Sequence, residues 1–384
     1  MKKIFYAGML GLIVFEILNV YFIMPMPGSQ RFHSIDVAYA LHRYRWVFRI
    51  ACVLLIAAGA GTAFRVRWPW RSAPIALMLL TLTVAWICSF MMNAESMFKQ
   101  PNHLVFQGRS LNQLDEASIV IGLEHNGQAK AWPVRLLVYH HQVQDTVGGL
   151  PVLVTYCSVC RTGRVFEPLV RGQPEKFRLV GMDHFNAMFE DSGTGSWWRQ
   201  ANGTAVVGPL KGAALPEVPS FQMTLKQWFD LHPDSQVMQP DADFLAQYDT
   251  DGRFERGESQ GSLTRTDRAS WKDKSWVVGI EVHGASKAYD WNRLRELRVI
   301  NDNVGETPIV LVLAADGQGF AAFARPGDEF RLEGDVLTSA GRRYDFLGRD
   351  LMDPARRLQM LHASQEFWHS WRTFHPGTGR YESR

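Results

Sequence analysis

Three long apolar runs in the first quarter of the chain constrain its fold more than any other feature. They extend from Phe5 to Met24, from Val47 to Phe64 and from Ala73 to Met92, roughly 18 to 20 residues each. A helix needs about 20 apolar residues to cross the ~30 Å hydrocarbon core of a bilayer. The sequence therefore predicts an N-terminal three-helix transmembrane anchor over residues 1–95.

Basic residues beside these runs predict the orientation of the anchor. Lys2 and Lys3 precede the first run, and Arg65, Arg67 and Arg71 lie between the second and the third. Short loops rich in Lys and Arg stay in the cytoplasm. We therefore expect a multi-pass protein of the cell inner membrane, in contact with the lipid bilayer, with its C-terminal domain on the periplasmic, extracytoplasmic side.

Two ionisable residues, Glu16 and Arg49, lie within the predicted spans. An ionisable group at membrane depth is costly unless it finds a partner. We expect Glu16 to face the neighbouring helices or pair with another span, and Arg49 to reach towards the interface. The small residues at positions 57–63 predict close helix packing. These features indicate a tether and not a transporter.

The rest of the chain has the composition of a folded soluble protein. Over the whole chain, 41 Lys and Arg nearly balance 38 Asp and Glu, and no basic cluster is interleaved with aromatic residues. We therefore expect no nucleic acid partner. Short apolar segments separated by Gly and Pro predict a mainly β, antiparallel fold with a few short helices.

An internal repeat organises this part. Residues 120–157 align without gaps to residues 277–314, and residues 225–233 resemble 366–376. Such self-similarity is the signature of a repeated structural unit. We predict two duplicated units: a first β-rich unit at residues 96–265 that carries a Cys-X-X-Cys site, and a second, shorter β-rich unit at residues 266–384 that lacks it.

Each unit has the same predicted order of elements. A strand, a turn at Asn126-Gly127 and a second strand precede one turn of helix after Pro133. Strands before and after Gly148 follow, then a hairpin return through residues 163–166. A helix near residues 224–231 completes the unit.

Residues that occur in one copy alone are candidates for function, because shared positions serve the common fold. Cys157 and Cys160 align with Ala314 and Gly317. His140 aligns with Leu297, and His141 aligns with Arg298. The repeat thus places candidate chemistry in the first unit.

Several kinds of chemistry use Cys-X-X-Cys. A redox motif places its first cysteine at the start of a helix, whereas the residues after Cys160 predict a return strand. A metal knuckle needs a tight turn with glycine nearby, and Gly163 is suitably placed. Covalent haem attachment requires His at position 161, where this chain has Arg161. A structural disulfide is also compatible with an extracytoplasmic compartment.

Two thiolates do not complete a zinc site, so further ligands are expected. His140 is the leading candidate because it directly precedes the strand predicted to pair towards the Cys hairpin. Secondary candidates are His141, His184, Met182 and Met188. A Cys2His or Cys2HisMet set suits copper at least as well as zinc.

Residues 183–200 form a second concentration of polar and aromatic side chains. We expect Asn186, Asp191 and Trp198 to line a pocket near the cysteines. The Gly-Thr-Gly within this stretch lacks the Lys-Ser/Thr of a phosphate-binding loop, so we interpret it as a turn into a Trp-bearing strand and expect no nucleotide cofactor. No pattern distinctive of a hydrolase is present.

Several motifs resemble a bacterial and archaeal family catalogued as domain of unknown function 3179. They are Trp132-Pro-Val-Arg with His140, Asp145-Thr-Val-Gly-Gly149, Pro151-Val-Leu-Val-Thr-Tyr-Cys157-Ser-Val-Cys160, Gly193-Thr-Gly-Ser-Trp197 and Gly208-Pro-Leu-Lys-Gly212. The resemblance covers roughly residues 100–380. It implies a shared fold and an exported or membrane-tethered setting, without an established activity.

The chain departs from that family's usual pattern, Tyr-Cys-Pro-Leu-Cys-Gly with an upstream His-Glu. Here Ser158 and Val159 replace Pro-Leu, Arg161 replaces the Gly, and His141 replaces the Glu. Both cysteines and the preceding histidine are retained.

Three functions fit the sequence. The leading hypothesis is a membrane-anchored extracytoplasmic protein that binds copper or zinc through Cys157, Cys160 and His140. The alternatives are a thiol–disulfide oxidoreductase that uses the same cysteines, and a non-catalytic assembly or scaffold factor that binds a protein partner.

Overall fold

The computed structural model describes residues 1–65, 72–353 and 355–382. By internal contacts the chain forms two compact units. The first comprises Met1–Lys99, Phe177–Arg199 and Thr204–Ala213, and the second comprises Gln100–Lys176, Gln200–Gly203 and Ala214–Arg384. The boundaries predicted at residues 95 and 265 stay predictions, and Arg67 and Arg71 lie outside the described residues.

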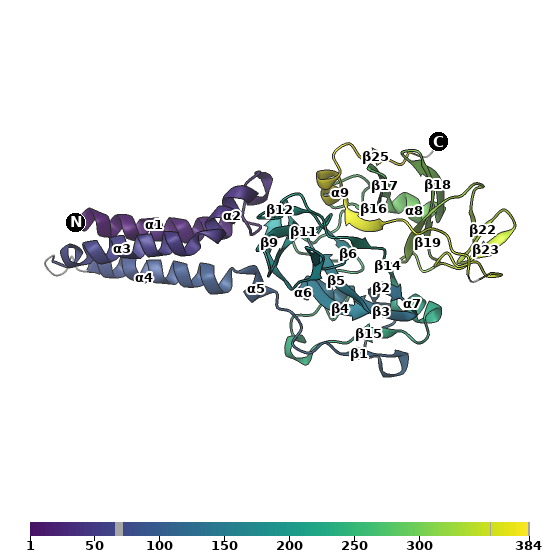
Figure 1. Ribbon diagram of the computed structural model, residues 1–384, viewed down its shortest axis with the longest axis horizontal. Helices are drawn as coiled ribbons and strands as arrows, with labels where there is room; N and C mark the ends of the chain where they lie inside the picture. The colour runs from purple at the N-terminus through teal and green to yellow at the C-terminus, as the bar shows by residue number, and fades with distance from the viewer. Residues whose placement is uncertain (66–71, 354, 383–384) are drawn as a thin grey trace. The chain divides into compact units, whose positions relative to one another are not determined.

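Three long helices dominate the first unit and lie side by side in Figure 1. They are α1 (Lys2–Tyr21), α3 (Arg45–Ala63) and α4 (Ser72–Trp86), which continues as the π-helix η2 (Ile87–Met91). Each is long and apolar enough to cross a membrane. The three predicted apolar helices are therefore confirmed, and their length and composition are compatible with a membrane anchor.

Close packing and one ion pair hold these helices together. A Cβ atom at Gly59 would lie only 2.5 Å from the backbone nitrogen of Phe5, so the small residues of α3 do admit α1. Arg49 donates from Nε and Nη2 to the two carboxylate oxygens of Glu16, at 2.7 and 2.8 Å, and from Nη2 to Ser89 Oγ at 2.9 Å. All three helices thus share one polar network, which confirms that Glu16 pairs with a residue of another of the three helices.

Shorter elements complete the first unit. They are the helices α2 (Ile35–Arg43) and α5 (Ala94–Met97) and a four-stranded antiparallel sheet. Its strands, in spatial order, are β12 (Ala205–Val207), β11 (Trp197–Arg199), β10 (Asn186–Asp191) and β9 (Phe177–Asp183). The backbone of this sheet reaches the end of the first helical segment, where Met182 N donates to Ile23 O at 2.7 Å.

The second unit is mainly β, as predicted. Its largest sheet has the order β1 (Phe106–Gln107), β15 (Gln236–Met238), β3 (Gln128–Pro133), β2 (Ile119–His125), β14 (Phe221–Thr224), β20 (Phe320–Ala324), β19 (Thr307–Leu313), β18 (Val299–Val304). One four-stranded sheet has the order β13 (Glu217–Val218), β6 (Thr162–Phe166), β5 (Leu150–Cys157), β4 (Gln142–Val147). Another has the order β24 (Ala363–Phe367), β16 (Trp276–Val282), β17 (Ala285–Asp290), β25 (Gly379–Arg380).

Smaller sheets and the strand directions complete this description. One contains β21 (Arg331–Glu333), β22 (Val336–Ser339) and β23 (Arg342–Tyr344), and another contains β7 (Leu169–Val170) and β8 (Gln173–Pro174). Among the described residues, the named strands pair antiparallel except β3 with β15 and β17 with β25. The antiparallel character predicted from the short, turn-punctuated segments is therefore confirmed.

The two aligned sequence segments fold into the same order of elements. In the first, β2 and β3 precede α6 (Val134–His140) and then β4, β5 and β6; in the second, β16 and β17 precede α8 (Trp291–Leu297) and then β18, β19 and β20. The helices α7 (Leu225–Leu231) and α9 (Trp368–Phe374) follow in corresponding places. After α6 and α8 the chain turns through left-handed residues, His141 at φ 61° and Arg298 at φ 59°.

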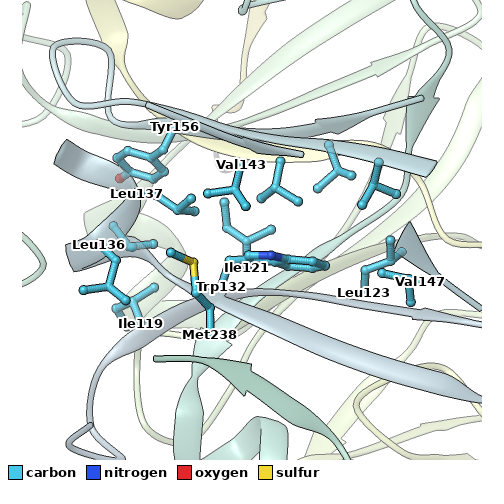
Figure 2. Close-up of a cluster of buried hydrophobic side chains, with 14 of the residues drawn as sticks. Ile119, Ile121, Leu123, Trp132, Leu136, Leu137, Val143, Val147, Tyr156 and Met238 are labelled. Carbon is cyan, nitrogen blue, oxygen red and sulfur yellow. The ribbon is translucent and has the colours of Figure 1, made fainter. Parts of the chain in front are cut away.

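A buried apolar cluster fixes the strands that carry the cysteines (Figure 2). Trp132 of β3 and Tyr156 of β5 are essentially inaccessible to solvent, and Figure 2 shows Tyr156 beside Leu137 of α6. Tyr156 directly precedes Cys157, so packing of its ring determines where the end of β5 lies. Burying such a ring stabilises the fold by about 1.5–3 kcal/mol.

A glycine faces a tryptophan at the same place in both aligned segments. A Cβ atom at Gly122 would lie 2.3 Å from the ring of Trp228, and one at Gly279 would lie 2.1 Å from the ring of Trp371. We expect Gly279→Ala to lower the free energy of unfolding by about 1–3 kcal/mol, because the indole must move in a close-packed core. Chemical denaturation of the full chain measures this change. Gly284→Ala is not a clean control because its φ is 79°, whereas Gly327→Ala meets nothing within 4 Å and should change little.

Candidate functional site

The two cysteines of the second unit lie on one β-hairpin. Cys157 is the last residue of β5 and pairs with Thr162, the first residue of β6. Residues 158–161 form the turn between them. Both side chains are buried thiols, with exposed fractions of 1% for Cys157 and 0% for Cys160. The predicted hairpin return is confirmed, and no helix begins at Cys157.

Arg161 closes the turn in a left-handed conformation, at φ 57°. Its buried guanidinium donates to the backbone oxygens of Phe254 and Glu255, both at 2.7 Å, and to Gln365 Oε1 at 3.1 Å. The guanidinium carbon also lies 3.5 Å from the ring centroid of Trp276. These contacts satisfy a buried charge, as burial requires, and hold the turn that carries Cys160.

Lys274, in the segment before β16, holds the middle of the same turn. Its ammonium donates to Val159 O at 2.9 Å and to Leu263 O at 2.5 Å. Burial lowers the pKa of Lys274 to about 8, while Cys160 and Cys157 act in the opposite direction. Lys274 is therefore within electrostatic range of both sulfur atoms, where its positive charge would stabilise thiolates.

The last helix of the chain contributes a third support. His369 of α9 lies with Nε2 3.3 Å from Val159 O and 3.2 Å from Lys274 Nζ. Burial, and then the charge of Lys274, lower the pKa of His369 to about 4. Phe367 N donates to Cys160 O at 2.8 Å. The turn that carries Cys160 is thus held by residues on both sides of the second aligned segment: Lys274 precedes it, and Phe367 and His369 follow it.

His140 is the last residue of α6 and is fully buried. It directly precedes the turn into β4, which pairs with β5 as predicted. Its Nε2 lies 2.7 Å from the hydroxyl of Tyr248, and the rings of Tyr139, Phe244 and Tyr248 surround it. The structure thus gives His140 a buried aromatic setting with a phenol at one ring nitrogen.

His141 occupies the left-handed position after α6, and its carbonyl oxygen accepts from Tyr156 N at 2.9 Å. This bond ties the helix end to the residue before Cys157. Burial lowers the pKa of His141 to about 4, the contact with Tyr156 acts against this shift, and His140 adds to it. The imidazole is consequently neutral at pH 7.

The residues predicted to line a pocket belong to the first unit. Asp191 accepts at its carboxylate from Thr194 N, Ser196 N and Trp198 Nε1, at 2.5, 3.1 and 2.8 Å. This carboxylate therefore organises the turn into β11, which confirms the interpretation of Gly-Thr-Gly as a turn into a Trp-bearing strand. Asn186 is the first residue of β10 and is fully buried.

The secondary ligand candidates at positions 182, 184 and 188 also belong to the first unit. Met188 is buried within β10, and Met182 lies in β9. His184 adopts φ 51°, and its Nδ1 lies 2.7 Å from Asp183 Oδ1. The cysteines and His140 belong to the second unit.

Across residues 1–65, 72–353 and 355–382, no three or more His, Cys, Asp and Glu side chains are grouped so as to hold one metal ion. The assignment of His140 as a ligand therefore stays a prediction.

The sequence did not point to Lys274 and His369, the two side chains that contact Val159 in the cysteine turn. His369 aligns with Lys226 when residues 366–376 are matched to 225–233, so a search for residues peculiar to the later of these two matched segments would have found it.

The fold and the site define a β-rich protein with a buried Cys-X-X-Cys hairpin and, within the residues that the structure describes, three helices long enough to span a membrane. The chain belongs to the family described as protein of unknown function DUF3179, whose model matches residues 100–378. No curated protein matches the chain, and no solved structure matches it.

Proposed function

We propose that this protein binds a soft transition-metal ion through the thiolates of Cys157 and Cys160. The observation that carries the proposal is the hairpin itself: Cys157, at the end of β5, and Cys160, in the turn that follows, are both buried, and Arg161, Lys274 and Phe367 fix this turn. A rigid turn that presents two thiols in a buried setting suits ions that prefer sulfur ligands.

The donor set favours copper(I) over zinc. Zinc in a structural site takes four ligands, and the part of the chain that the structure describes groups no third Cys, His, Asp or Glu side chain with the two sulfurs. Copper(I) is selected by soft thiolate ligands and does not impose a tetrahedral set of four. His140 remains a candidate additional ligand, as its position before β4 suggested.

Charge balance supports the same ion. Two thiolates and one copper(I) carry a net charge of −1, which is costly to bury without a counter-charge. The ammonium of Lys274, fixed by two backbone carbonyl groups and within range of both sulfurs, supplies that counter-charge.

Competition with a chromophoric copper(I) chelator under reducing conditions tests the proposal on the full chain in detergent. Wild-type protein is expected to withdraw copper(I) from the chelator, and Cys157→Ser/Cys160→Ser is expected not to. The matched control is Cys52→Ser/Cys88→Ser, which removes the other two cysteines of the chain. If the wild type and Cys157→Ser/Cys160→Ser withdraw equal amounts of copper(I) from the chelator, the proposal is wrong.

Replacing Lys274 with Met should weaken copper(I) binding by about tenfold, because one buried counter-charge is lost while the side chain keeps its length. The chelator competition measures this change. Lys272→Met is the matched control, since Lys272 is an exposed neighbour on the same segment. An unchanged affinity in Lys274→Met would show that the ammonium does not act on the bound ion.

Thiol–disulfide exchange is the second candidate, and the position of Lys274 also favours it. A cation beside a buried thiol raises the thiolate fraction and thereby its reactivity. A helix start at the first cysteine, the other common means of stabilising a thiolate, is absent at Cys157. A disulfide potential well below about −300 mV would mark the pair as structural and argue against this activity.

We further propose that the protein resides in the cell inner membrane with its C-terminal part on the periplasmic side. The support is the Lys2-Lys3 pair before α1 and the basic residues between α3 and α4. In an oxidising compartment, formation of a disulfide between Cys157 and Cys160 would compete with copper(I) binding by the same two thiolates. A reporter enzyme fused at the C-terminus, active only outside the cytoplasm, tests the orientation.

A further inference from the structure

A polar cavity of about 400 Å³ lies in the first unit, at one end of the three long helices. Its walls come from the end of the first helical segment, the start of α3, η2, α5 and the strands β9 and β10. A helix of 20 residues is about 30 Å long, the thickness of the hydrocarbon core. The cavity at the helix ends therefore lies at the level of lipid headgroups when the helices span a bilayer.

The charges around this cavity are separated into two groups. Arg45 and Arg49 lie at the start of α3, while Glu95 and Glu190 lie on α5 and β10. Arg178 joins the two groups, since it pairs with Glu190 at 2.7 Å and with Glu95 at 3.3 Å. The cavity is thus lined by cationic side chains from α3 and by anionic side chains from α5 and β10.

Arg45 is the cation best placed to bind a ligand. Its Nη1 donates to His42 O at 2.7 Å, and it forms no ion pair within residues 1–65, 72–353 and 355–382. Arg49, by contrast, is paired with Glu16. A guanidinium with spare donors is suited to phosphate oxygens, to which it can bind in a bidentate manner.

The sum of charges argues for a ligand without net charge. Arg45, Arg49 and Arg178 are balanced by the carboxylates of Glu16, Glu95 and Glu190. Burial, and then the charge of Arg45, lower the pKa of His42 to about 4, so this histidine is neutral at pH 7. A ligand that carries both a phosphate and an ammonium leaves this balance unchanged.

Apolar surface adjoins the polar cavity. Val20, Ile23 and Val180 contribute to its walls. Trp46 and Val47, which follow Arg45 in α3, have exposed fractions of 62% and 64%. A ligand whose polar part fills the cavity can therefore place acyl chains against the outer face of α3. An exposed Trp at this level is typical of the membrane–water interface, where Trp is enriched.

We propose that this cavity binds the headgroup of a zwitterionic phospholipid, with the phosphate on Arg45 and a primary ammonium towards Glu95 and Glu190. The site is independent of the cysteine pair, because all its residues belong to the first unit. The primary ammonium distinguishes phosphatidylethanolamine from phosphatidylcholine, since only the former has N–H groups to donate to a carboxylate.

Lipid retention tests the proposal on the full chain. The protein is reconstituted in nanodiscs that contain equal amounts of phosphatidylethanolamine, phosphatidylcholine and phosphatidylglycerol, and the lipid kept after transfer to detergent is counted by native mass spectrometry. Wild type is expected to retain phosphatidylethanolamine preferentially. Arg45→Ala is expected to reduce this retention by about tenfold, and Arg43→Ala, which alters an exposed residue of α2 outside the cavity, is expected to leave it unchanged.

A second variant separates the two ends of the headgroup. Glu95 is exposed, so Glu95→Gln should fold, and we expect it to reduce the preference for phosphatidylethanolamine over phosphatidylcholine. Equal retention of all three lipids by the wild type would overturn the proposal, as would equal retention by Arg45→Ala and Arg43→Ala. Displacement of the lipid by millimolar glycerophosphoethanolamine, which lacks acyl chains, would show that the cavity takes a small soluble ligand instead.

Discussion

Replacing Arg164 with Met is expected to lower the free energy of unfolding by about 3–5 kcal/mol, the usual cost of removing one partner from a buried ion pair. Arg164 lies on β6 and donates to Glu217 of β13 at 2.9 Å and to Glu366 of β24 at 3.1 Å. Burial alone would lower the pKa of Arg164, but the two carboxylates raise it. The substitution leaves Glu366, which has an exposed fraction of 1%, without its cation.

This effect should be specific to the buried network. Ser364 and Ser370 also donate to Glu366, at 2.8 and 2.9 Å, and they cannot replace a full positive charge. Arg372→Met is the matched control, because Arg372 pairs with Asp273 at the surface and should cost no more than about 1 kcal/mol. Urea denaturation of the full chain in detergent measures the free energy of unfolding of both variants. Equal losses for the two variants would contradict the role assigned to Arg164.

Acidification from pH 6.5 to pH 4 is expected to destabilise the second unit by several kcal/mol. His141 and His369 both have a pKa of about 4 in the folded protein, lowered chiefly by burial, against about 6.5 in the unfolded chain. Between these values the unfolded chain takes up protons that the folded chain does not. Stability is thus fully present above pH 6.5 and is lost as the pH falls to about 4, by about 1.4 kcal/mol per pH unit for each buried imidazole.

Denaturation midpoints measured at intervals between pH 4 and pH 7.5 test this dependence. His369→Gln should remove the contribution of one imidazole and make the dependence shallower. His103→Gln should leave it unchanged, because the side chain of His103 has an exposed fraction of 72%. A stability that is constant over this range would mean that neither His141 nor His369 is held in its neutral form by burial.

Local patterns predicted much of the fold. Three apolar runs predicted α1, α3 and α4, and Asn126-Gly127 predicted the β2–β3 hairpin, whose turn adopts the positive φ values that this dipeptide favours. The return strand after Cys160 and the short helix after Pro133 also lie where the sequence placed them. These features depend on neighbouring residues, so the sequence carries a direct signal for them.

Contacts between distant residues were not predictable in the same way. Val159 meets Lys274 and His369 at separations of 115 and 210 residues, and His140 meets Tyr248 at a separation of 108. Such pairs depend on how sheets pack, and no periodicity or turn signal records them. The same holds for β9 to β12, which group with the N-terminal helices although they lie far from them in the chain.

X-ray absorption at the copper edge of the full chain, loaded with one copper(I) under reducing conditions, tests the central claim most directly. The two-thiolate site predicts a first shell with two sulfur ligands in the wild type and in Cys52→Ser/Cys88→Ser, and its loss in Cys157→Ser/Cys160→Ser. A first shell made only of nitrogen and oxygen, or one that is unchanged when Cys157 and Cys160 are replaced, would contradict it.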